Sequence, residues 1–151
     1  MSTTRSTQHV KAPRAAVYRA LLDPKAVQQW QVPDGMTSEV HAFEPHEGGT
    51  FRISLTYEAT SSAGKTSAHT DTFHGTFVNL VENERVVQSI EFETDKPEMQ
   101  GVQTITYSLF DAAGGTDIHG LHENVPSSIA DDNKLGWQIS LRKLAALVEA
   151  G

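Results

Sequence analysis

The sequence predicts an α+β fold in which an antiparallel sheet curls around one long C-terminal helix. Three observations support this prediction. Residues 127–149 are the one long stretch with helical periodicity, residues 37–123 show the alternation of strands, and residues 4–30 suggest one strand followed by two short helices. A single amphipathic helix must bury its apolar stripe, and here only a sheet is available to cover it.

The N-terminal strand is predicted over residues 4–11. Its one shared face carries Thr4, Ser6, Gln8 and Val10, of which only Val10 is apolar. Threonine favours extended backbone, and an edge strand or a strand facing a ligand tolerates a polar face. We therefore expect a strand here despite its polarity.

Two short helices are predicted next. Ala12-Pro13 begins the first, because proline at the first helical position sacrifices no hydrogen bond. Asp23-Pro24 ends that helix and begins the second, with Asp23 as the N-cap. The second helix ends near Trp30, and residues 31–36 form a loop.

Six strands follow, because apolar and polar residues alternate between residues 37 and 123. The strongest alternation falls at residues 40–43, 51–57, 67–80, 86–93, 103–109 and 116–122. Short loops join them, with the hairpin loop at 61–65 and the longer loop at 95–101, which favours an antiparallel meander. Gly75, inside the longest strand, indicates a bulge or a close approach of two backbones.

The final helix has its apolar stripe at regular helical spacing, formed by Ile129, Trp137, Leu141, Leu144 and Val148. Ser128 followed by Asp131 has the form of a capping box, so we expect Ser128 to cap the helix. Gly136 is unusual, because glycine inside a helix costs about 1 kcal/mol relative to alanine. Either the helix packs closely on the sheet there, or the missing side chain leaves room for a ligand.

The composition favours one domain over residues 1–151 and excludes several classes of partner. A net charge of −7 and a pI near 5.4 argue against nucleic acid, which requires a basic face. No stretch is apolar enough for a membrane span or a secretory signal, so a cytoplasmic location is expected. The absence of cysteine excludes disulfides and a thiolate nucleophile.

The seven histidines suggest a metal site, but their spacing does not. His119 and His122 are three residues apart on a strand and therefore point to opposite faces. His69 and His74 have the same difficulty unless Gly75 bulges the strand, and a metal needs three or four converging ligands. We predict no metal site. We also expect no cofactor, because no phosphate loop or dinucleotide fingerprint is present.

Two residues are candidates for acid–base chemistry. His122 shares a face with Ile118 and Gly120, which we place toward the helix, where a neutral imidazole could bind a ligand or act as a base. A core histidine bonded to a backbone carbonyl is the favoured alternative. Asp71 shares a face with Phe73, but a surface position is favoured because acids are rarely buried.

Four stretches of the chain, in this order, follow the pattern of a known family. They are Ala12-Pro13 with residues 17–24 and Trp30; Glu47-Gly48-Gly49 before residues 51–53; Gly75 with residues 84–87; and residues 115–123 followed by Gly136-Trp137 and Leu144. On these stretches the chain resembles the START-like superfamily, also called birch-pollen-allergen-like, polyketide-cyclase-like or helix-grip proteins. Within it, the chain resembles the activator of heat-shock protein 90 ATPase-like family.

The resemblance implies a helix-grip fold, in which a curved seven-stranded antiparallel sheet grips the C-terminal helix and leaves a cavity between them. It implies no single reaction, because the superfamily includes lipid and hormone binders, cyclases, hydratases and co-chaperones. The chain departs from the family pattern at Gly120, at Asn124 and at Phe43-Glu44, where the family has a signature Asp. The co-chaperones of this name also carry an additional N-terminal domain, for which 151 residues leave no room.

We therefore expect a protein that binds a small, largely apolar molecule between the sheet and helix 127–149. The 95–101 loop and the Trp30 region would flank the mouth of its cavity. The candidate cavity residues are Ile53, Leu55, Tyr57, Phe73, Ile90, Phe92, Ile105, Tyr107, Gly120, His122, Gly136 and Trp137.

Two other functions are open. The same cavity could serve an enzyme of the cyclase or hydratase type, with His122 or Asp71 as its acid–base group, although no catalytic residue can be assigned. Alternatively, the chain could be a protein-interaction domain like the co-chaperones, which would require a large exposed apolar patch. A homodimer is possible in each case, and a chaperone partner is the less favoured choice.

Overall fold

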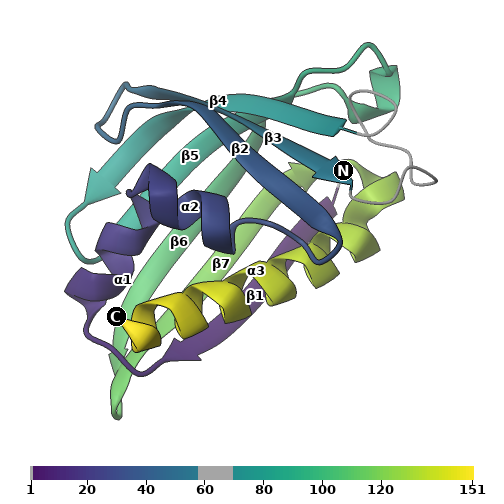
Figure 1. The fold of residues 1–151 in the computed structure, drawn as a ribbon. Coiled ribbons are helices and arrows are strands. Elements are labelled where there is room, and N and C mark those ends of the chain that lie inside the picture. The colour runs from purple at the N-terminus through teal and green to yellow at the C-terminus, as the bar shows by residue number, and fades with distance from the viewer. Residues whose placement is uncertain (1, 58–69) are drawn as a thin grey trace.

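The protein forms a curved seven-stranded sheet that wraps around its C-terminal helix (Figure 1). The computed structural model describes residues 2–57 and 70–151. The elements, in order, are β1 (Ser2–Val10), α1 (Arg14–Leu21), α2 (Pro24–Trp30), β2 (Met36–Phe43), β3 (Thr50–Tyr57), β4 (Thr70–Val81), β5 (Arg85–Phe92), η1 (Pro97–Met99), β6 (Gln103–Ala112), β7 (Gly115–Val125), η2 (Ser127–Ile129) and α3 (Ala130–Ala150).

All neighbouring strands are antiparallel, in the order β1-β7-β6-β5-β4-β3-β2, so β1 and β2 form the two edges. The predicted helix-grip fold, with two short helices after the first strand and one long helix at the end, is confirmed. The predicted hairpin loop at 61–65, the first residues of the strand 67–80 and His69 lie outside the described residues.

The inner face of the sheet follows from strand alternation, since successive side chains point to opposite faces. On β6 the alternate residues Gln103, Ile105, Tyr107 and Leu109 are all buried. The predicted shared face of β1 also points inward, because its Thr4, Ser6 and Val10 are buried.

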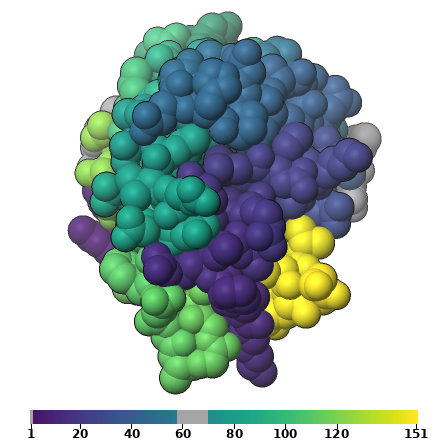
Figure 2. All heavy atoms as spheres, turned by 90° about the vertical axis from the view of Figure 1, so that its left-hand side faces the viewer, coloured from purple at the N-terminus to yellow at the C-terminus, as the bar shows by residue number. Residues whose placement is uncertain are grey.

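The two short helices cover one end of the sheet. The Asp23 carboxylate accepts a hydrogen bond of 3.0 Å from the backbone N–H of Lys25, so the predicted N-cap of α2 is confirmed. Trp30 closes α2 and is buried, with its indole N–H donating to the Ala20 carbonyl at 3.0 Å. Figure 2 shows this end of the molecule, where α1 lies beside the C-terminal end of α3.

The long helix begins later than the sequence suggests. Residues 127–129 form the 3-10 turn η2, and α3 starts at Ala130 without a side-chain cap. The predicted capping box is therefore wrong, because Ser128 lies inside a helical turn and not in the extended conformation of an N-cap. The middle of α3 is buried at Leu141, Leu144 and Ala145. In the described part of the chain, no helix is both long and apolar enough to cross a membrane.

Gly75 marks a close approach of neighbouring strands. A Cβ at this position would clash with the backbone carbonyl oxygen of Ser89 and would lie 2.7 Å from the Phe51 ring. The irregular register of β4 lies further along, between Phe77 and Asn79, so the bulge does not fall at Gly75. The glycine is needed for the spacing of β3, β4 and β5.

We predict that Gly75→Ala lowers the free energy of unfolding by about 1–3 kcal/mol, because the added methyl group displaces a backbone carbonyl. Chemical denaturation followed by circular dichroism measures the change. Gly120→Ala is the matched control, since its Cβ would lie 3.7 Å from Leu141 and Ser6, at ordinary contact distance. Equal stability of the two variants would contradict the close approach at Gly75.

Candidate ligand-binding pocket

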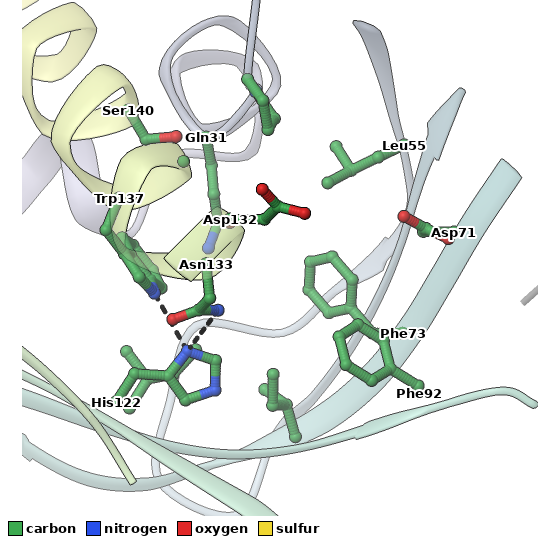
Figure 3. A pocket seen from close by; sticks show the side chains of 14 residues that line it. Gln31, Leu55, Asp71, Phe73, Phe92, His122, Asp132, Asn133, Trp137 and Ser140 are labelled. Atoms are coloured by element: carbon green, nitrogen blue, oxygen red, sulfur yellow. Dashed lines mark hydrogen bonds between the residues drawn. The ribbon is translucent and has the colours of Figure 1, made fainter. Parts of the chain in front are cut away.

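A pocket of about 130 Å³ lies between the sheet and α3. Its wall combines residues from the inner face of the sheet with one side of the long helix and the segment that follows α2 (Figure 3). The lining residues are Gln31, Pro33, Leu55, Asp71, Phe73, Ile90, Phe92, Ile105, His122, Asp132, Asn133, Gly136, Trp137 and Ser140.

The apolar part of the wall results from the pairing of β3, β4 and β5. Phe73 on β4 lies opposite Phe92 on β5, and Leu55 on β3 lies opposite Asp71 on β4. Because paired residues of antiparallel strands point to the same face, these side chains gather on one side of the pocket. Figure 3 shows both phenyl rings there, facing the helix residues across the cavity.

His122 joins the sheet to the helix through a hydrogen-bond network. Its Nε2 lies 2.7 Å from the Gln103 Oε1, and its Nδ1 lies 2.9 Å from the indole nitrogen of Trp137 and 3.2 Å from the Asn133 Nδ2. An indole N–H can only donate, so Nδ1 is the acceptor and the proton of the neutral ring sits on Nε2. The network thus fixes the tautomer of His122 and the position of Trp137.

Burial keeps His122 neutral. The side chain is 3% exposed, and loss of solvation lowers its pKa from 6.5 to about 4. The prediction of a histidine satisfied by a backbone carbonyl is wrong, because its partners are the side chains of Gln103, Asn133 and Trp137. Gln103 lies on β6, and Asn133 and Trp137 lie on α3. The sequence around His122 on β7 therefore does not reveal these partners.

Asp71 is buried on the pocket wall, at 1% exposure. The favoured prediction of a surface acid is wrong. Phe73 and Phe77 share its face of β4 and are buried in the core, so strand alternation carries Asp71 inward with them. For Asp71, the alternation of side chains along the strand predicts burial better than the general rarity of buried acids.

Gly136 lies where the helix meets the pocket. Among the described residues, a Cβ built there would have only the Pro33 ring within 4 Å, at 3.9 Å. This spacing is ordinary van der Waals contact, so helix packing does not require a glycine. Of the two interpretations of Gly136, the structure contradicts close packing and leaves open space beside the pocket.

The structure brings together eight of the twelve predicted cavity residues on the pocket wall: Leu55, Phe73, Ile90, Phe92, Ile105, His122, Gly136 and Trp137. The other four lie elsewhere. Ile53 and Tyr107 are buried in the core, and Tyr107 packs edge-on against both Trp30 and Trp137. Tyr57 ends β3 opposite Met36, and Gly120 faces Leu141, whose side chain would lie 3.7 Å from a Cβ at this position.

The polar residues of α3 were missed. Asn133 and Ser140 lie four residues before and three residues after Trp137, on the same side of the helix. Their position inside an apolar helical stripe could have indicated the pocket, because a polar side chain on a buried face needs a hydrogen-bond partner or a cavity. At the mouth, Gln31 and Pro33 follow Trp30 as predicted, but no residue of the 95–101 loop lines the pocket.

The histidines do not converge. On β7, His119 is exposed and His122 is buried, as expected for residues three apart. Within residues 2–57 and 70–151, no three His, Asp or Glu side chains are close enough to hold a metal ion.

The comparison with known families agrees with this architecture. The sequence model described as "Activator of Hsp90 ATPase homolog 1-like protein" matches residues 11–149. The chain belongs to this family. The resemblance seen in the sequence to START-like, activator of heat-shock protein 90 ATPase-like proteins is therefore confirmed. No curated protein matches the chain.

Several solved structures share the fold. Protein CV1439 from Chromobacterium violaceum is 32% identical, with a TM-score of 0.86 over 97% of this chain and 96% of that chain. The AHSA1-like protein from Aeromonas hydrophila is 19% identical, with a TM-score of 0.73 over 99% and 93%. DynU16, a protein of the dynemicin biosynthetic locus, is 20% identical, with a TM-score of 0.71 over 100% of this chain and 48% of that one. The last two show likeness of fold alone.

Proposed function

We propose that this family member binds a small, largely apolar molecule in the pocket between the sheet and α3. The observation that carries the proposal is the unfilled volume of about 130 Å³ within largely apolar walls. Protein interiors are close-packed, and their voids rarely exceed one water molecule. A space several waters large, lined by phenyl and indole rings with a few polar groups, is what a binding site for a small molecule requires.

We predict that Gly136→Leu abolishes this binding while the protein stays folded. The leucine side chain would occupy the space beside Pro33, and the helix itself gains about 1 kcal/mol from loss of the glycine. Benzyl alcohol is a suitable neutral probe, with its affinity measured from the shift of the Trp137 indole N–H signal in NMR titrations.

The matched control is Gln138→Leu, which adds the same side chain to an exposed position of α3 two residues away. We expect the control to bind benzyl alcohol like the unmodified protein. Unchanged affinity in Gly136→Leu would contradict the pocket as the binding site.

The enzyme alternative receives less support from His122. Its Nδ1 lone pair already accepts hydrogen bonds, and its pKa of about 4 makes it a weak base at neutral pH. Asp71 is the remaining acid–base candidate on the wall. If the pocket is catalytic, Asp71→Asn would abolish turnover of a substrate and His122→Gln would not.

The interaction alternative would need a contiguous apolar surface. Among the described residues, the exposed large apolar side chains are Val78, Val102, Phe110 and Leu135, which lie on separate parts of the fold. A chaperone partner, a homodimer and a cytoplasmic location remain predictions.

A further inference from the structure

Ser140 places a buried hydroxyl group on the pocket wall. The residue belongs to the middle of α3, is 4% exposed and lines the pocket. Figure 3 shows its hydroxyl turned away from the helix, toward Gln31. Because Ser140 lies in the same pocket, this inference rests on the proposed function.

In the described part of the chain, the Ser140 hydroxyl has no hydrogen-bond partner. A serine inside a helix often bonds the backbone carbonyl one turn earlier, but no such bond to the Gly136 carbonyl is formed here. Burying a polar group without a partner costs free energy, so buried polar groups nearly always have one. An unpartnered hydroxyl on a pocket wall therefore indicates a polar atom of the ligand beside it.

The segment that follows α2 covers this part of the helix. Lys143, three residues after Ser140 and on the same side of α3, donates to the Val32 carbonyl at 2.7 Å. Four residues before Ser140, a Cβ on Gly136 would lie 3.9 Å from the Pro33 ring. The segment thus contacts the helix on both sides of Ser140, which keeps Ser140 out of open solvent.

Gln31 supplies a second polar atom to this end of the pocket. Its amide nitrogen donates to the buried Tyr107 hydroxyl over 3.4 Å, and its amide oxygen makes no hydrogen bond among the described residues. The amide oxygen can only accept, whereas the Ser140 hydroxyl can donate and accept. A ligand hydroxyl complements both atoms because it also donates and accepts, whereas a carbonyl or ether oxygen can only accept.

The volume and the aromatic wall define the rest of the ligand. A cavity of about 150 Å³ engineered into another protein binds benzene, so the present volume of about 130 Å³ suits a single ring. Figure 3 shows Phe73 and Phe92 across the cavity from Ser140. We propose that the pocket binds a small neutral alcohol built on one ring, with the ring against Phe73 and Phe92 and the hydroxyl group hydrogen-bonded to Ser140 and Gln31.

Benzyl alcohol and toluene are a matched pair of probes, since they carry the same ring and differ only in the hydroxyl group. The Trp137 indole N–H signal, assigned with a Trp137→Phe variant, reports each affinity. Ser140→Ala removes the hydroxyl of the protein and keeps the helix, because alanine has the highest helix propensity. We expect the preference for benzyl alcohol over toluene to fall about fivefold in Ser140→Ala, as for the loss of one hydrogen bond between uncharged groups.

Ser6→Ala is the matched control variant. Ser6 lies on β1, is 7% exposed and also has an unpartnered hydroxyl, but it does not line the pocket. We expect the preference for benzyl alcohol in Ser6→Ala to stay within about twofold of that in the unmodified protein. An equal fall in both variants would overturn the role of Ser140, since it would reflect a general change in packing.

The outcomes separate this proposal from the proposed function. An unchanged preference for benzyl alcohol in Ser140→Ala would overturn the selection of a hydroxyl group and leave the pocket as a binding site, with water as the partner of Ser140. Failure of both probes to bind the unmodified protein would overturn the proposed function itself, and the selection of an alcohol with it.

Discussion

Replacing Trp30 by alanine should lower the free energy of unfolding by about 3–5 kcal/mol, because a fully buried indole is lost and its cavity only partly collapses. Trp30 is 1% exposed and meets Tyr107 edge-on, with ring centroids 6.1 Å apart. Its indole N–H is the partner of the Ala20 carbonyl, which would be left without it. The expected loss in the free energy of unfolding has three contributions: apolar burial, the ring contact with Tyr107 and one buried hydrogen bond.

Chemical denaturation measures this loss, and Trp30→Phe separates its parts. Phenylalanine keeps an aromatic ring near Tyr107 but cannot donate to the Ala20 carbonyl. We expect Trp30→Phe to cost clearly less than Trp30→Ala, and a loss below about 1 kcal/mol for Trp30→Ala would contradict the assignment of Trp30 to the core.

Trp30 also affects the position of the pocket mouth. Gln31 and Pro33 follow it directly and line the mouth, so the anchoring of α2 by Trp30 sets where the mouth lies. A variant that folds with a displaced α2 should therefore bind benzyl alcohol less well, without any change on the sheet side of the pocket.

Local patterns were sufficient to predict the fold. The alternation from Phe51 to Tyr57 and from Gln103 to Leu109 is a property of each strand alone, and so is the Asp23-Pro24 start of α2. Short connections then leave an antiparallel meander as the simplest topology. The same patterns placed Phe73, Phe92 and Trp137 on inward faces, which is why most of the predicted cavity residues lie on the pocket wall.

The site itself depends on relations between distant segments, which no local pattern contains. Gln103, His122 and Trp137 belong to β6, β7 and α3, and their hydrogen bonds follow from the way these elements pack. Whether inward residues fill the interior or leave a cavity depends on the sum of their volumes. Gly120 and Gly136 illustrate this, because a Cβ would fit at both positions but only Gly136 lies on the pocket wall.

Acid should destabilise the protein through His122. In the unfolded chain its pKa is near 6.5, and in the folded protein burial lowers the pKa to about 4. Between these values the unfolded state binds a proton that the folded state does not, so the stability present above pH 6.5 is lost as the pH falls toward 4. At about 1.4 kcal/mol per pH unit, the loss attributable to His122 amounts to about 3 kcal/mol.

His122→Gln provides the comparison, because glutamine keeps an acceptor for the Trp137 indole and does not titrate. The unmodified protein and the His122→Gln variant share every other titrating group. The difference between their free energies of unfolding, measured from pH 7 to pH 4, therefore isolates the contribution of His122. We expect the unmodified protein to lose stability more steeply, and parallel curves would contradict the burial of a neutral His122. Protonation would also place a proton on Nδ1, where Trp137 and Asn133 donate, so benzyl alcohol affinity should fall as pH 4 is approached.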